Sequence, residues 1–198
     1  MAVWFWSTLV TATLSFAATN IDDIFVLTVF FSQTSRGFRS AHIVAGQYLG
    51  FSALVAISLL GFLGGQILPR SWIGLLGFVP ILVGIRRWIH RHDPPVHVKV
   101  SAAASTTTVT AVTFGNGGDN IGVYTPLFAS CDGSRLTITL VTFYLLLAVW
   151  CFVGYAVTHH PAVARLLASY GHMVVPFVLV GLGIYIIVGS GALALFRF

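Results

Sequence analysis

The chain has 198 residues, of which 57% are hydrophobic and only 8% are charged, and its formal net charge is +5. These charged residues are too few to cover the surface of a soluble domain, which excludes that class. The composition is typical of an integral membrane protein with nearly all of its chain in the bilayer. The basic residues are scattered among short loops, which argues against nucleic acid as a partner.

Six apolar stretches are long enough to cross a bilayer as helices, because a spanning helix needs about 20 residues. They are too long and too uniformly apolar for the strands of a membrane barrel. No Lys or Arg comes before Arg36, so the first stretch lacks the basic start of a signal peptide, and we expect a retained helix. The expected spans are residues 3–31, 42–68, 72–90, 104–130, 136–157 and 171–196.

The basic residues also predict the orientation of these spans. The side that carries more Lys and Arg in its loops is the cytoplasmic one. The loops after the first, third and fifth spans carry the larger share, so we expect both termini to be extracytoplasmic. The larger share consists of Arg36, Arg39, Arg86, Arg87, Arg91, Lys99 and Arg165, and the smaller one of Arg70, Arg135 and Arg197.

The first three spans resemble the last three. A shift of 97 residues places Asp22 on Asp119, whereas a shift of 96 places Asp23 there and Pro80 on Pro176. Chance similarity between apolar segments is the alternative. Because each half has an odd number of spans, the copies would form an inverted repeat, as in many secondary transporters. The expected parts are residues 1–90 for the first repeat, 91–103 for a cytoplasmic linker and 104–198 for the second repeat.

The linker is expected to be an exposed connection, because it contains two prolines, several charges and small residues. His90, His92 and His97 lie near Asp93 in or beside it. Their spacing matches no closed metal site, so a solvated loop is the favoured interpretation.

Two polar motifs interrupt the first and fourth spans. They read ATNIDDIF at 18–25 and TFGNGGDNIGVYTPLFA at 113–129. A carboxylate at the bilayer centre costs about 2.5–3.5 kcal/mol on insertion scales, so these carboxylates should face protein or a watery cavity. The glycines of the second motif favour a local break in its helix. The candidate site residues are Asn20, Asp22, Asp23, Asn116, Asp119 and Asn120, with Thr19, Gln47, Gly117 and Gly118 as candidates for supporting roles.

The two motifs would meet near the bilayer midplane if their spans lie side by side and antiparallel. Neither motif contains Lys or Arg, so repulsion between the carboxylates favours binding of a cation, a proton or both. Oxygen ligands suit Ca²⁺, Mg²⁺ or Mn²⁺ and do not single out a soft metal. The two cysteines, Cys131 and Cys151, are interpreted as packing residues. A structural polar network between helices is the alternative for the polar residues.

The strings ATNIDDIFVLTVFFSQ, GQYLGF, GNGGDNIGVYTPLFA and VPFVLVGLGIYI together resemble the cadmium resistance transporter family, the CadD-type branch of the LysE superfamily of exporters. The resemblance runs over nearly the whole chain. It implies an all-α integral membrane protein of the bacterial cytoplasmic membrane that exports Cd²⁺, with Zn²⁺ as a further candidate. It places function on the six candidate site residues named above.

Three functions follow from these observations. The leading hypothesis is a secondary exporter of divalent heavy-metal cations that exchanges them for protons. It would use no cofactor and no ATP, since no GxxxxGK[ST] motif occurs. The alternative is a LysE-like exporter of another small solute, such as an amino acid or organic cation. An intramembrane aspartyl protease is disfavoured, because its Tyr-Asp and Gly-x-Gly-Asp motifs are missing. The sequence leaves the oligomeric state open, including a homodimer.

Overall fold

The computed structural model describes residues 2–89, 105–159, 161–190 and 192. The predicted linker at 91–103 and its histidines lie outside these residues. Every regular element in the described part is a helix. The helices are α1 (Ala2–Asn20), α2 (Asp23–Ser32), α3 (Ser40–Ile67), α4 (Arg70–Leu75), α5 (Phe78–Ile89), α6 (Thr106–Asn116), α7 (Gly118–Ala129), α8 (Gly133–His159) and α9 (Pro161–Gly189).

Three stretches are long and apolar enough to cross a membrane, namely Ser40–Ile67, Ser71–Ile89 and Gly133–Thr158. The pair α1 and α2, which is bent by 57°, adds a fourth if it forms one span. In α9 the described apolar part, Val174–Gly189, is shorter, and α6 and α7 have only 11 and 12 residues. The predicted helical membrane class is therefore confirmed, whereas the number of six spans stays a prediction, because three candidate spans, or four with the bent pair, are found among the described residues.

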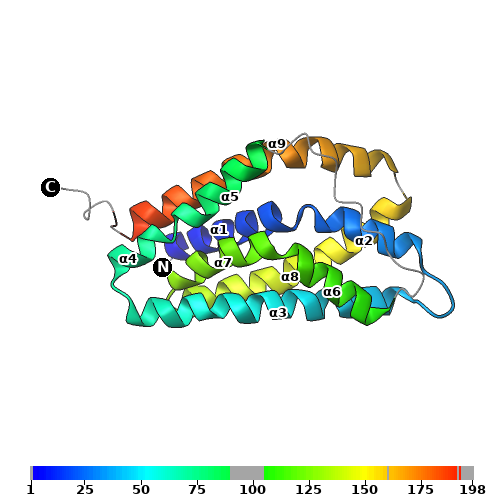
Figure 1. The fold of residues 1–198 in the computed structure, drawn as a ribbon, viewed down its shortest axis with the longest axis horizontal. Helices are drawn as coiled ribbons and strands as arrows, with labels where there is room; N and C mark the ends of the chain where they lie inside the picture. Colours follow the sequence, from blue (N-terminus) through cyan, green and yellow to red (C-terminus); the bar gives the residue numbers. More distant parts are fainter. Residues whose placement is uncertain (1, 90–104, 160, 191, 193–198) are drawn as a thin grey trace.

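The helices run along the long axis of the molecule (Figure 1). The pair α5 and α9 lies at the top of this view and α3 at the bottom, with α1, α2, α6 and α7 between them. The broken pair α1–α2 packs mainly on α8, the pair α6–α7 packs on α3, and α5 packs on α9. Each main contact thus joins a helix of the first half of the chain to a helix of the second.

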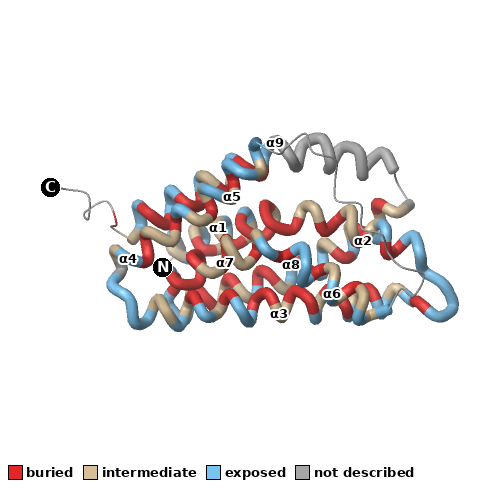
Figure 2. Tube along the Cα trace, viewed as in Figure 1, coloured by how far each residue is buried: buried red, intermediate tan, exposed pale blue. Residues whose placement is uncertain are grey.

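Aromatic side chains fill the interior, and large apolar side chains also cover the outside. Phe16, Phe51 and Phe143 are fully buried in the main core. In contrast, Leu145 is 65% exposed and Phe152 is 69% exposed on the outer face of α8. The buried positions follow the inner sides of the helices (Figure 2). An exposed apolar exterior of this kind is stable in contact with lipid, which agrees with the membrane class.

Glycines on α3 allow the two halves of the broken pair α6–α7 to approach it closely. A Cβ atom at Gly46 would lie 2.7 Å from the carbonyl oxygen of Thr106, and one at Gly50 would lie 2.9 Å from that of Thr110, both on α6. Gly61 packs in the same way on the backbone of Thr125 in α7. Small residues four apart are a common means of close helix packing in membranes.

Both polar motifs coincide with breaks between helices. The expected break in the second motif is present, because α6 ends at Asn116 and α7 begins at Gly118. The first motif contains a similar break, since α1 ends at Asn20 and α2 begins at Asp23. The indole Nε1 of Trp150 donates a hydrogen bond of 2.8 Å to the carbonyl oxygen of Asn20, which satisfies a backbone group freed by the break.

Candidate functional site

The two helix breaks lie against each other and are joined through Tyr124. Its hydroxyl accepts hydrogen bonds from Asn20 Nδ2 at 2.7 Å and from Asn120 Nδ2 at 3.4 Å, and it shares one of 2.8 Å with the hydroxyl of Thr19. Asn120 Nδ2 also donates to Asn20 Oδ1 at 3.1 Å. These four side chains are at most 3% exposed. The network therefore fixes the end of α1 to the start of α7.

Asp22 and Asp119 both form ion pairs with the guanidinium of Arg87. Arg87 Nη2 donates to Asp22 Oδ2 at 2.7 Å, and Nη1 donates to Asp22 Oδ1 at 3.3 Å. The same Nη2 also forms an ion pair with Asp119 Oδ2. The remaining oxygen, Asp119 Oδ1, accepts the backbone N–H of Asn120 at 3.0 Å. One arginine therefore links the start of α2 to the start of α7.

Arg87 corrects two predictions. We expected it in a cytoplasmic loop, but it belongs to the last turn of α5. The second concerns the charge of the acidic motifs: neither contains Lys or Arg, but Arg87 reaches both from a third helix and partly neutralises their carboxylates. Its side chain is 23% exposed, and the side chains of Asp119 and Asp22 are 14% and 46% exposed. The charge of Arg87 therefore lies inside the site rather than in a loop.

Asp23 has different partners from the other two carboxylates. Gln47 Nε2 of α3 donates to Asp23 Oδ2 at 3.1 Å, and the hydroxyl of Thr113 of α6 donates to Gln47 Oε1 at 2.6 Å. Asp23 is 8% exposed, Gln47 1% and Thr113 1%. Gln47, predicted as a supporting residue, thus orients Asp23 and is itself oriented by Thr113.

The remaining predicted residues have more peripheral places. Asn116 is exposed at the end of α6. Gly117 is buried, and the side chain of Leu54 occupies the space where a Cβ atom would stand. Gly118 is exposed and has open space around its Cα. A Cβ atom at Gly117 would therefore displace the side chain of Leu54, whereas one at Gly118 would displace nothing.

The charges of the site leave it negative. Three ionised carboxylates and one guanidinium sum to −3 + 1 = −2, counted over Asp22, Asp23, Asp119 and Arg87. Asp23 lies in the first turn of α2 and Asp119 in that of α7, where the positive end of the helix dipole favours an anion. Among the described residues, no group of three His, Cys, Asp or Glu side chains is arranged to hold a metal ion. The carboxylates are grouped around an arginine instead.

A family model described as the cadmium resistance transporter matches residues 16–197, which is nearly the whole chain. The chain belongs to this family. No curated protein and no solved structure matches it. The matched region contains both acidic motifs, Gln47 and Arg87, so the whole geometry described above lies within it.

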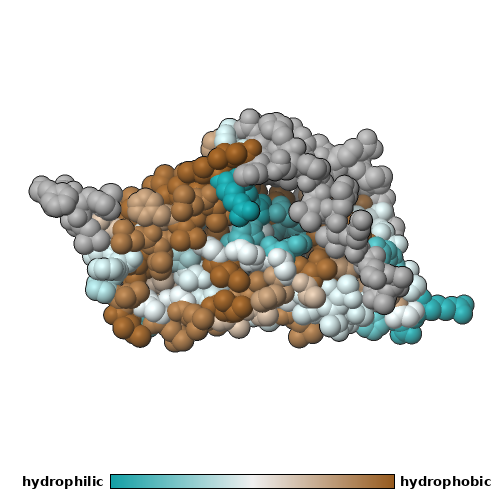
Figure 3. Space-filling view, viewed as in Figure 1, coloured by the Kyte–Doolittle hydropathy of each residue, from teal (hydrophilic) through white to brown (hydrophobic). Residues whose placement is uncertain are grey.

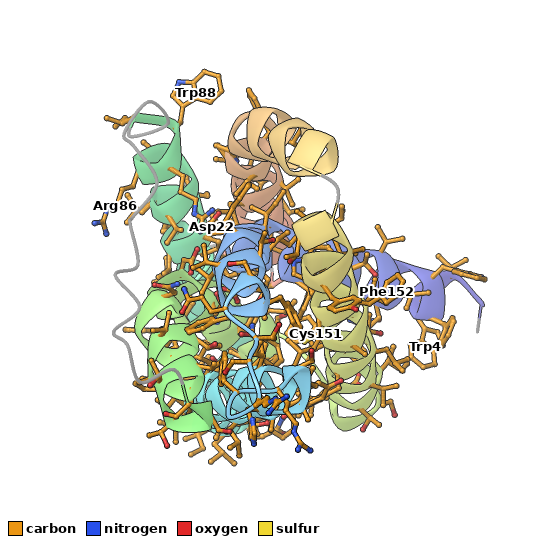
Figure 4. All side chains as sticks on the ribbon, turned by 90° about the vertical axis from the view of Figure 1, so that its right-hand side faces the viewer. Trp4, Asp22, Arg86, Trp88, Cys151 and Phe152 are labelled. Atoms are coloured by element: carbon orange, nitrogen blue, oxygen red, sulfur yellow. The ribbon has the colours of Figure 1, made fainter. Side chains whose placement is uncertain are left out.

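In this cadmium resistance transporter, hydrophilic side chains gather around a hollow near the middle of one face, below the end of α5 (Figure 3). Asp22 lies between α5 and α2 within the bundle, whereas Arg86 projects from the outer side of α5 (Figure 4). A separate pocket of about 680 Å³ lies where α3, α7 and α9 end, and its lining includes Gln66, Cys131 and Asp132. None of the predicted site residues lines that pocket.

Two residues of the transporter site were missed by sequence reasoning. Arg87 follows an apolar run at the end of an expected span, so it was counted among the loop charges. The neighbouring Arg86 could have supplied that loop charge alone, which would have left Arg87 available for the site. Tyr124 is part of the second motif, but nothing in the sequence distinguishes its hydroxyl from those of the other tyrosines. Its complete burial with three polar partners is visible only in the structure.

Proposed function

We propose that this transporter exports divalent heavy-metal cations, Cd²⁺ and also Zn²⁺, from the cytoplasm by exchange for protons. The observation that carries the proposal is the convergence of two broken helices that each present a carboxylate at the start of a helix, Asp22 before α2 and Asp119 in α7. Broken helices at membrane depth are the usual way in which secondary transporters build an ion site.

The charge of the site supports a divalent cation as cargo. Asp22, Asp23 and Asp119 together carry a formal charge of −3, which favours binding of a divalent cation or of protons. Because metal-binding carboxylates must be deprotonated, metal binding and proton binding exclude each other. The same residues can therefore carry the metal outward and protons inward, without a cofactor.

The site and the far pocket suggest how access alternates. Along α7, the backbone of Asp119 lies about 15 Å from that of Ala129, the last residue of the helix, which lines the pocket. Tyr124 and Phe128 lie on α7 between them, are fully buried, and pack on Phe143. We propose that these aromatic rings close the path to the pocket in the state described here, and that rocking of the two halves opens it.

The contact pattern supports two inverted three-helix repeats, 1–90 and 104–198, in a LysE-like arrangement of six spans. In such a repeat, α1–α2 corresponds to α6–α7, α3 to α8, and α5 to α9. The packing of α1–α2 on α8 then matches the packing of α6–α7 on α3, and α5 packs on its own counterpart α9. When Arg87 is removed from the loop charges, six basic residues remain on one side (7 − 1) against three on the other. The proposed orientation, with extracytoplasmic termini in a bacterial cytoplasmic membrane, is unchanged.

The substrate class can be tested by uptake of radiolabelled Cd²⁺ into inside-out vesicles, with unlabelled competitors. We expect Zn²⁺ to compete and lysine to have no effect, and we expect uptake to drive protons out of the vesicles. No uptake of Cd²⁺ by folded protein, together with uptake of radiolabelled lysine or an organic cation, would instead indicate the LysE-like exporter of small solutes and would refute metal export.

A further inference from the structure

We propose that Arg87 is an internal counter-cation, which occupies the acidic site when the transported metal is absent and must leave Asp22 and Asp119 for the metal to bind. This inference rests on the proposed function, because it assigns to Arg87 a role in selecting and releasing that cargo. Arg87 would thus determine metal affinity and turnover without being a metal ligand.

The hydrogen bonds of the site provide the first argument. Arg87 uses both oxygens of Asp22 and one oxygen of Asp119. The other oxygen of Asp119 accepts a backbone N–H. A metal bound by these two carboxylates would need the same oxygens, since carboxylates bind divalent cations, Zn²⁺ among them, directly through oxygen. The guanidinium and the metal therefore compete for one set of acceptors.

Electrostatics provides the second argument. A divalent cation between Asp22 and Asp119 would lie within a few ångströms of the guanidinium, and like charges that close repel strongly in a partly buried site. Arg87 and the two aspartates are each less than half exposed, so water does not fully screen this repulsion.

The position of Arg87 in the fold provides the third argument. Its helix, α5, packs most extensively on α9, and Gly84 of α5 touches the backbone of Pro176 there. The ion pairs of Arg87 connect this helix pair to the broken helices that hold the carboxylates. Metal binding would break that connection, and return of the arginine would help to expel the metal.

The first test measures Cd²⁺ binding to the purified full chain with Arg87→Met, with Arg87→Lys as the charge-conserving variant and Arg86→Met as the matched control. Arg86 lies on the same helix and projects away from the bundle, so its variant removes the same charge outside the site. We expect Arg87→Met to bind Cd²⁺ at least about tenfold more tightly than wild type, because a competing unit charge is lost. We expect its maximal transport rate to fall together with its KM. Arg87→Lys and Arg86→Met should keep a Cd²⁺ affinity and a transport rate near those of wild type.

A second test uses the wild-type chain, so it does not depend on a variant that folds. An arginine-selective dicarbonyl reagent is applied with and without saturating Cd²⁺. Peptide mass spectrometry then measures the rate of modification of Arg87 and of Arg86 separately. We expect Cd²⁺ to speed modification of Arg87 severalfold and to leave Arg86 unchanged. A rate at Arg87 that stays constant or falls while Cd²⁺ is bound would overturn the inference.

The outcomes separate this inference from the proposed function. Cd²⁺ binding by wild type, with equal or weaker binding by folded Arg87→Met, would contradict the counter-cation role and leave metal export intact. Failure of wild type and of every folded variant to bind Cd²⁺ or Zn²⁺ would refute metal export, and the counter-cation role with it.

Discussion

Replacement of Tyr124 by Phe removes one oxygen atom from the centre of the buried network that joins the two helix breaks. That hydroxyl has three polar partners, Thr19, Asn20 and Asn120. Each partner keeps another hydrogen bond. The Thr19 hydroxyl still donates to the carbonyl oxygen of Ser15, and Asn20 Nδ2 still donates to that of Phe16. Asn120 Nδ2 still donates to Asn20 Oδ1. No partner is therefore left without a bond.

The expected cost follows from this count. Two of the three bonds join α1 to α7, and the third lies within α7. At about 0.6 kcal/mol each, the average for interhelical hydrogen bonds in membrane proteins, their loss lowers the free energy of unfolding by about 1–2 kcal/mol. For a chain of this length, that change corresponds to a melting temperature about 2–8 °C lower. Tyr144→Phe is the matched control, because its hydroxyl shares a single hydrogen bond of 2.9 Å with Ser52. It should lower the melting temperature by about a third as much.

The assay is thermal unfolding in detergent together with Cd²⁺ binding at a temperature where all variants are folded. We expect Tyr124→Phe to melt lower and to bind Cd²⁺ with nearly wild-type affinity. A melting temperature no lower than that of Tyr144→Phe would show that the network does not stabilise the breaks. Lost Cd²⁺ binding without lost stability would place the hydroxyl of Tyr124 among the metal ligands and refute its structural role.

Three further predictions concern packing, thiol chemistry and capping. Gly50→Ala should lower the free energy of unfolding by about 1–3 kcal/mol, because its Cβ would lie 2.7 Å from Thr113 Cβ. Gly64→Ala on the same helix meets nothing within 4 Å and should be neutral or stabilising. Equal melting temperatures of the two variants would contradict the close packing of α3. Burial raises the pKa of the Cys131 thiol to about 11. In a Cys151→Ser background, maleimide should therefore react with Cys131 at pH 8 about 100-fold more slowly than with an ordinary thiol, and the rate should rise about tenfold for each unit of increase in pH. Reaction at the rate of an ordinary thiol would show an accessible thiolate. Asp132→Ala removes the side-chain oxygen that accepts the N–H of Arg135 at the start of α8, and it should lower the free energy of unfolding by about 1 kcal/mol. An unchanged melting temperature would show that this cap does not stabilise α8.

The sequence predicted the parts of this molecule that depend on composition and local pattern. Hydropathy alone predicted the membrane class, and the glycines before Asp119 predicted the break between α6 and α7. It did not predict the arrangement of the site, because contacts between distant segments carry no local signal. Arg87 shows this most clearly, since it lies 65 residues from Asp22 and 32 from Asp119 along the chain.

Asparagines illustrate the same limit. Asn20, Asn116 and Asn120 were predicted with equal weight as ligands. In the structure, Asn20 and Asn120 bond to each other and to Tyr124, whereas Asn116 is exposed. The contacts of Asn20 and Asn120 are therefore those expected of the alternative, a structural polar network between helices. A ligand and a network residue have the same side chain, and only their neighbours distinguish them.

The most direct test of the account compares uptake of radiolabelled Cd²⁺ into inside-out vesicles by wild type and by Asp119→Asn at equal amounts of folded protein. The carboxylate of Asp119 is held by Arg87 within the site. We predict that wild type takes up Cd²⁺ and that Asp119→Asn abolishes this uptake. Full uptake by Asp119→Asn would contradict a cation site between the two broken helices.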